Sequence, residues 1–91
     1  MKLIYPGVFY KENDAYWIEF PDLQGCQSFG DTIEEIYDNA KEALYVYCST
    51  LTEQGKILNP PSDILKMRPP QNAFVSLVDT NLVLSKELQT G

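Results

Sequence analysis

Carboxylates are the side chains of this sequence that could carry chemistry. The chain has no histidine, so the commonest general base, metal ligand and partner of a nucleophilic serine or cysteine is missing. Asp14, Glu19 and Asp22 lie close together in the sequence and could bind a hard cation such as Mg²⁺. A nuclease built on such a site would also need basic residues to hold its substrate, and this segment has almost none. We therefore expect no catalytic residue, no metal and no cofactor, and keep a carboxylate-dependent nuclease as an alternative.

The two cysteines, Cys26 and Cys48, do not change this expectation. They are too far apart in the sequence for a local metal-binding pair, and two thiols alone do not make a zinc site. We expect both to be reduced and buried as small hydrophobic residues. The start of the chain lacks the apolar core of a signal peptide, and no apolar run is long enough to cross a bilayer. These features predict a cytoplasmic protein.

Acidic residues are concentrated in the middle of the chain. Ten acids and one base, Lys41, lie between Glu12 and Glu53, and the whole chain has a net charge of −6 and a pI near 4.4. A nucleic-acid-binding protein normally presents a basic face to the phosphates. The charge therefore predicts no direct DNA or RNA binding, no membrane binding, and attraction of basic proteins at long range. Acids that simply solubilise a small domain would give the same composition.

The elements that must position these residues follow from residue patterns. Strands are expected at residues 3–10, 15–20, 26–29 and 73–79, which are rich in β-branched and aromatic types. Pro6 lacks an amide donor, which suggests that the first strand lies at an edge of the sheet or carries a bulge. An open edge there would allow a homo-oligomer, either a dimer or a tetramer.

The second predicted strand places its side chains alternately on two faces. Tyr16, Ile18 and Phe20 would share the core face, with Trp17 and Glu19 on the other. Because an exposed aromatic residue next to acids is typical of an interface anchor, we predict a partner-binding set on or beside this hairpin. Its members are Asp14, Trp17, Glu19 and Asp22. The alternative for Trp17 is packing beneath residues 60–61, and Tyr45 is a second aromatic residue that could face a partner.

The clearest element is a helix from about Ile33 to Gln54. Thr32 and Glu35 form a capping box at its start, and Gly55 is a plausible C-cap. Apolar residues at helical spacing predict one buried stripe. This stripe contains Ile33, Ile36, Tyr37, Ala40, Ala43, Leu44, Tyr47 and Leu51.

The rest of the chain completes a single predicted domain of residues 1–91. The prolines at 60–61 predict an extended segment after the helix, followed by a short turn at 62–65. The core would span residues 3–79 and a tail residues 80–91, with a helical turn possible at 82–88. The order β-β-β-α-β predicts an α+β fold, a two-layer sandwich of an antiparallel sheet and one main helix.

Several segments in this order resemble the HicB antitoxin family. The stretch FPDLQGCQSFGDTIEEIYDNAKEAL at residues 20–44 resembles that family closely, as do YPGVFY, AYWIEF and GKILNPPS. Together they cover about residues 5–62. The sequence departs from the family pattern at Gly7, Gln24 and Ile36.

The resemblance implies both a fold and a partner. The fold would be a degenerate ribonuclease H-like domain without catalytic acids. The partner would be a HicA-type toxin, a small basic mRNA-cleaving protein whose active surface the antitoxin covers. The family usually carries a C-terminal DNA-binding domain, and the twelve residues after Asp79 are too few for one. We therefore expect toxin neutralisation without promoter binding, with an orphan HicB-like protein-binding module as the alternative.

Overall fold

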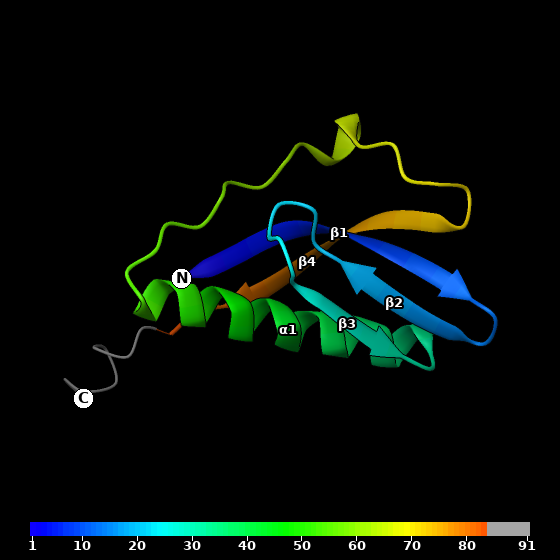
Figure 1. Cartoon of the computed structure of the whole chain (residues 1–91), viewed down its shortest axis with the longest axis horizontal. Helices are drawn as coiled ribbons and strands as arrows, with labels where there is room; N and C mark the ends of the chain where they lie inside the picture. The colour runs from blue at the N-terminus through cyan, green and yellow to red at the C-terminus, as the bar shows by residue number, and fades with distance from the viewer. Residues whose placement is uncertain (84–91) are drawn as a thin grey trace.

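A four-stranded antiparallel sheet and one long helix form the fold of residues 1–83, which the computed structural model describes. The elements are β1 (Lys2–Glu12), β2 (Ala15–Glu19), β3 (Gln27–Gly30), α1 (Ile33–Glu53), the short 3₁₀ helix η1 (Ile64–Lys66) and β4 (Ala73–Asn81). The strands lie in the order β3-β2-β1-β4 (Figure 1), and each neighbouring pair is antiparallel. The predicted α+β class with one main helix is confirmed.

The position of Pro6 differs from the prediction. β1 lies inside the sheet, between β2 and β4, and its register with β4 continues through Pro6 without a bulge. However, β1 pairs with β2 only from Val8 onward. At Pro6 the strand therefore has a neighbouring strand on one side only, and a residue without an amide donor is tolerated there. The edge strands of the sheet are β3 and β4, so the prediction that β1 is an edge strand is wrong, and its open side is limited to the residues before Val8.

The last strand is longer than predicted. β4 continues to Asn81, two residues past Asp79, and Leu82 is 1% exposed. Thr80 is also buried. Leu82 and Val83 belong to no helix or strand, and the remainder of the helical turn predicted at 82–88 lies outside the described residues.

The hydrophobic core fills the space between α1 and the side of the sheet that faces it. Its members are almost fully buried: Tyr5, Phe9, Ile18, Phe20, Leu23, Cys26, Ile36, Ala40, Leu44, Cys48, Val78 and Leu82. On α1 the most buried residues repeat every four positions, which is the spacing of one helix face. Cys48 ends this repeat, whereas Ile33 lies on its flank and is 49% exposed. The inclusion of Ile33 in the buried stripe is therefore wrong.

Two glycines allow the packed layers to approach closely. A Cβ atom on Gly30 would lie 2.7 Å from the backbone nitrogen of Ile36 in α1. A Cβ atom on Gly7 would lie 2.6 Å from the Cδ1 atom of Ile18. Side chains at these two positions would push against the helix backbone and the core, respectively.

Both ends of α1 carry caps, with one change from the prediction at each end. The hydroxyl of Thr32 accepts a hydrogen bond from the backbone N–H of Glu35 at 3.1 Å. The carboxylate of Glu35 accepts from the backbone N–H of Asp31 at 3.1 Å, one residue before the cap itself. At the other end, Gln54 is the C-cap and Gly55 has a φ of 75°, the left-handed conformation that favours glycine.

Of the helices in residues 1–83, none is long and apolar enough to span a membrane.

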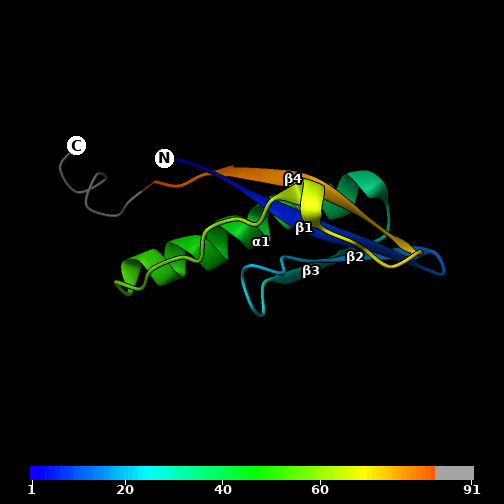
Figure 2. The same ribbon diagram turned by 90° about the horizontal axis from the view of Figure 1, so that it is seen from above.

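After α1 the chain crosses to the other side of the sheet. Residues 54–72, here called the return segment, start at the end of α1, and their later part lies on the side of the sheet opposite α1 (Figure 1), where η1 overlies β1 and β4 in Figure 2. None of these residues is buried, although Leu58, Ile64 and Met67 are partly covered. Leu58 packs against the core, and polar contacts of Asn59 and Ser62 also hold the return segment.

Candidate functional site

The side of the sheet opposite α1, here called the open face, carries a row of three aromatic residues. Tyr10 of β1 lies opposite Trp17 of β2, and Trp17 lies opposite Phe29 of β3. Their strand neighbours Phe9 and Ile18 point into the core, so alternation places the row on the other face. The rings of Tyr10 and Trp17 are stacked, with centroids 4.0 Å apart and an angle of 8° between planes. Phe29 is 67% exposed.

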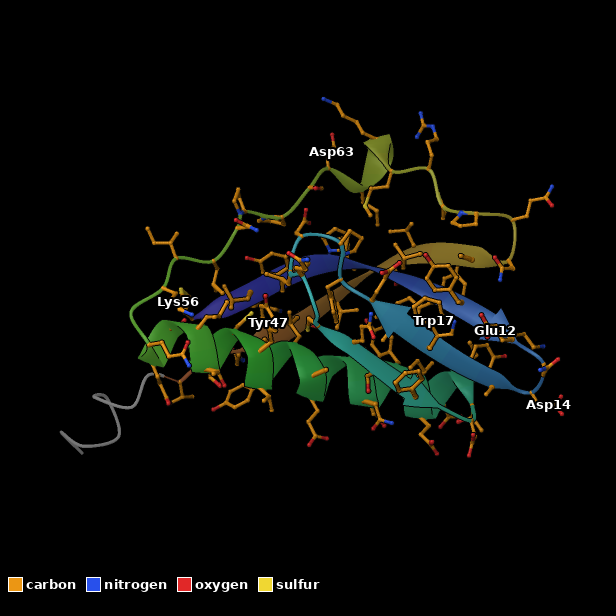
Figure 3. The ribbon with its side chains drawn as sticks, viewed as in Figure 1. Glu12, Asp14, Trp17, Tyr47, Lys56 and Asp63 are labelled. Atoms are coloured by element: carbon orange, nitrogen blue, oxygen red, sulfur yellow. The ribbon has the colours of Figure 1, made fainter. Side chains whose placement is uncertain are left out.

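Two carboxylates fix the rings of this row. Glu12 Oε1 accepts a hydrogen bond from the indole Nε1 of Trp17 at 3.2 Å, and Glu19 Oε2 accepts from the hydroxyl of Tyr10 at 2.7 Å. The hydrogen bond to Glu19, together with burial, raises the pKa of Tyr10 above its ordinary value of 10. Figure 3 shows Glu12 and Trp17 next to each other near the end of the β1–β2 hairpin. The open face therefore presents oriented aromatic rings with acids beside them.

The structure separates the four predicted site residues into three places. Trp17 and Glu19 lie together on the open face. Asp14 lies at the tip of the hairpin, after Asn13 with a φ of 54° (Figure 3). Asp22 lies in the turn after β2. Residues 1–83 contain no group of three metal-binding side chains, so Asp14, Glu19 and Asp22 do not form the Mg²⁺ site that the nuclease alternative requires.

Asp22 holds the return segment in place. Its carboxylate accepts hydrogen bonds from the backbone N–H of Ser62 at 2.8 Å and from the Ser62 hydroxyl. Its carbonyl accepts from the side-chain amide of Asn59 at 3.0 Å, and the hydroxyl of Tyr5 donates to the carbonyl of Asn59. Sequence reasoning missed this clamp because 40 residues separate Asp22 from Ser62.

A cleft separates the open face from the return segment. It has a volume of about 250 Å³ and lies between the strands and residues 67–70. The wall on the sheet side is formed by Val8, Tyr10, Glu19 and Val75. Glu19 also borders a second hollow of about 380 Å³ over the turn that follows β2, where the lining is mainly polar. Glu19 therefore borders two hollows at the end of β2.

The two cysteines are free and buried, as predicted. Cys26 donates from Sγ to the carbonyl of Ala43 at 3.6 Å. Burial, followed by the nearby Cys48, raises the pKa of Cys26 to about 12. A thiol that stays protonated at neutral pH is a poor nucleophile and metal ligand, so these residues serve the core.

Tyr45 lies on a different surface from the aromatic row. It is 37% exposed on α1, next to Val46, which is 54% exposed. The prediction that Tyr45 lies off the buried stripe is confirmed. Because α1 covers the opposite side of the sheet, a substitution of Tyr45 can serve as a control for substitutions on the open face.

Comparison with known sequences places the chain in a context of bacterial antitoxins. Residues 5–87 match the family model described as HicB_like antitoxin of bacterial toxin-antitoxin system. An uncharacterized 14.9 kDa protein in the rep-hol intergenic region of Haemophilus phage HP1 is 34% identical over 83 residues. The match covers 88% of this chain and 62% of the phage protein, so the chain spans less than two thirds of that relative.

Two solved structures share the fold. A toxin–antitoxin complex from Streptococcus pneumoniae matches with a TM-score of 0.81 at 22% identity, covering 99% of this chain and 86% of the other. The HicA3 and HicB3 toxin–antitoxin complex matches with a TM-score of 0.72 at 28% identity, covering 87% of this chain and 99% of the other. The fold described above is therefore shared with chains of two solved toxin–antitoxin complexes.

Proposed function

Because this chain belongs to the HicB-like antitoxin family of bacterial toxin–antitoxin systems, we propose that it binds a small basic HicA-type toxin and blocks its RNA-cleaving activity. The likeness to the HicA3 and HicB3 complex supports a partner of this class. The acidic middle of the chain supports it independently, since a negative surface attracts a basic RNA-binding protein and speeds the encounter.

The aromatic row of the open face is the observation that carries this proposal. Aromatic anchors with a polar border are typical of the residues that dominate binding energy in protein interfaces. Stacking and hydrogen bonds already fix Tyr10 and Trp17, so little side-chain entropy is lost when a partner covers them. Phe29 extends the row with a largely exposed ring.

The proposed contact set keeps two of the predicted residues and adds three. Trp17 and Glu19 stay in the set, and Tyr10, Glu12 and Phe29 join them because register and hydrogen bonds place them on the same face. For Asp14 and Asp22, a direct contact with the partner stays a prediction.

The proposed activity is binding rather than catalysis. Asp22 clamps the return segment, Glu19 accepts a hydrogen bond from Tyr10, and Asp14 lies apart at the hairpin tip. These acids therefore have separate structural settings instead of one shared reaction centre. The negative charge also disfavours direct binding of DNA or RNA. Since the proposed toxin acts on mRNA, we place this function in the cytoplasm.

Reconstitution with the cognate toxin tests the proposal. The toxin to test would be a small basic protein encoded by a reading frame next to this one, if that frame encodes such a protein. We expect a stable complex by size-exclusion chromatography and loss of mRNA cleavage when the chain is added. The association rate should fall as NaCl rises from about 0.1 to about 0.5 M, because salt screens attraction between exposed charges. A folded, active toxin that neither binds nor is inhibited would contradict the proposal.

A further inference from the structure

The cleft between the open face and the return segment has the size and lining of a site for one side chain. Its volume of about 250 Å³ lies below the range typical of pockets for drug-sized ligands, roughly 300–1,000 Å³. Most of its walls are apolar, with Val8 and Val75 from the sheet and Pro69 and Pro70 from the return segment. The acidic group in the lining is the carboxylate of Glu19.

Glu19 retains capacity for a cationic partner. One of its oxygens accepts the hydrogen bond from Tyr10, and it has no salt bridge with a lysine or arginine of residues 1–83. Arg68 also lines the cleft, but its Nη1 donates to the carbonyls of Leu65 and Met67, at 3.1 and 2.9 Å. The basic group already present is thus bonded to the return segment.

We propose that this cleft receives an arginine side chain of the bound partner, with its guanidinium on Glu19 and its methylene stem against Val8 and Val75. Arginine fits better than lysine because its planar guanidinium holds several donors in fixed positions. The carboxylate of Glu19 can accept from these donors with the lone pairs that its hydrogen bond to Tyr10 leaves free. Its apolar stem also matches the valine and proline walls. This inference rests on the proposed function and adds a specific recognition element to it.

A small-molecule probe tests the site without the toxin. The probe is N-acetylarginine amide, and the control is N-acetylcitrulline amide, which has almost the same shape without the charge. Titration followed by methyl NMR signals should show saturable shifts at Val8 and Val75 with the arginine probe. Citrulline should bind at least about tenfold more weakly, because a hydrogen bond between charged groups is lost. Equal binding of both probes, or shifts confined to another surface, would overturn the inference.

Variants of the cleft separate charge from shape. Glu19→Gln should weaken arginine binding about tenfold, whereas Glu42→Gln, an exposed acid on α1, should leave it unchanged. Val75→Phe should fill the cleft and reduce binding at least as much. Leu77→Phe on the same strand is its control, since Leu77 is exposed and does not line the cleft. A Glu19→Gln protein that is folded and binds the arginine probe like the original would contradict the site.

The probe and the toxin give distinguishable answers. If the toxin binds but its affinity is unchanged by Glu19→Gln and the arginine probe does not bind, the arginine site is wrong and the proposed function stands. If the arginine probe binds as expected but the toxin does not, the proposed function fails while the site itself is supported.

Discussion

The two faces of one sheet differ in how they use the same strands. Towards α1, the residues are apolar and almost fully buried, and Phe9 and Ile18 are 1% and 0% exposed. Towards the return segment, their neighbours Tyr10 and Trp17 are only partly covered, and carboxylates hold them. The strand period of two separates the two roles. One face therefore stabilises the fold, and the other leaves aromatic and acidic side chains accessible for the proposed partner.

The largest expected effect on stability comes from alanine substitutions of two adjacent residues, which lie on opposite faces of β2. Ile18→Ala should lower the free energy of unfolding by about 3 kcal/mol, because it leaves a cavity at a fully buried site. Trp17→Ala should cost only about 1 kcal/mol, since it loses mainly the stacking on Tyr10. Chemical denaturation measures both. A larger loss for Trp17→Ala would contradict the division between the faces.

The next effect concerns how closely the helix approaches the sheet. Gly30→Ala should destabilise the fold by about 2 kcal/mol, because the new Cβ atom would meet the backbone of α1. Gly7→Ala should cost less, about 1 kcal/mol, since the atom it meets is the end of the Ile18 side chain. Thermal unfolding of the two variants provides the comparison. Equal losses would show that backbone contact is not the limiting feature.

A smaller effect is expected from the clamp on the return segment. Asp22→Ala should reduce stability by about 1 kcal/mol and speed hydrogen exchange at the Ser62 amide, since both bonds to the carboxylate are lost. Asp14→Ala at the hairpin tip is the matched control and should change stability by less than about 0.5 kcal/mol. Unchanged exchange at Ser62 in the Asp22 variant would argue against the clamp.

The smallest effect is a pH dependence at the edge of the sheet. Burial raises the pKa of Asp79, but Lys41 and Lys2 outweigh it and hold the pKa below its ordinary value of 3.8. A lowered pKa contributes stability above 3.8 that is lost as the pH falls through the folded-state value. The melting temperature should therefore fall less in acid for Asp79→Asn than for the original chain. If the melting temperatures of the two proteins fall equally below pH ~4, this contribution of Asp79 would be contradicted.

Local signals in the sequence predicted the helix and the alternation of β2. Thr32 and Glu35 mark the start of α1, and the spacing of its apolar residues indicates the buried face. The place of β1 inside the sheet was not predictable in this way. Pro6 gives only a local signal for an edge or a bulge, whereas the order of the strands depends on pairing with β4, about 70 residues later.

The candidate site was predictable only in part. Alternation along β2 placed Trp17 and Glu19 on the face away from the core. Tyr10 and Phe29 join them through the register of three strands, which residue types alone do not specify. The role of Asp22 depends on a contact with Ser62, 40 residues away. The sequence around Asp22 indicates only an acid in a turn and gives no sign of this contact.

The central claim is that the open face, and not the helix side, binds the partner. The most direct test is the affinity of the cognate toxin for Trp17→Ala and for Tyr45→Ala, measured by calorimetry on folded proteins. We expect Trp17→Ala to weaken binding by at least about 30-fold, as for an interface anchor, and Tyr45→Ala to change it by less than about twofold. Unchanged binding by Trp17→Ala together with a strong loss for Tyr45→Ala would contradict the claim.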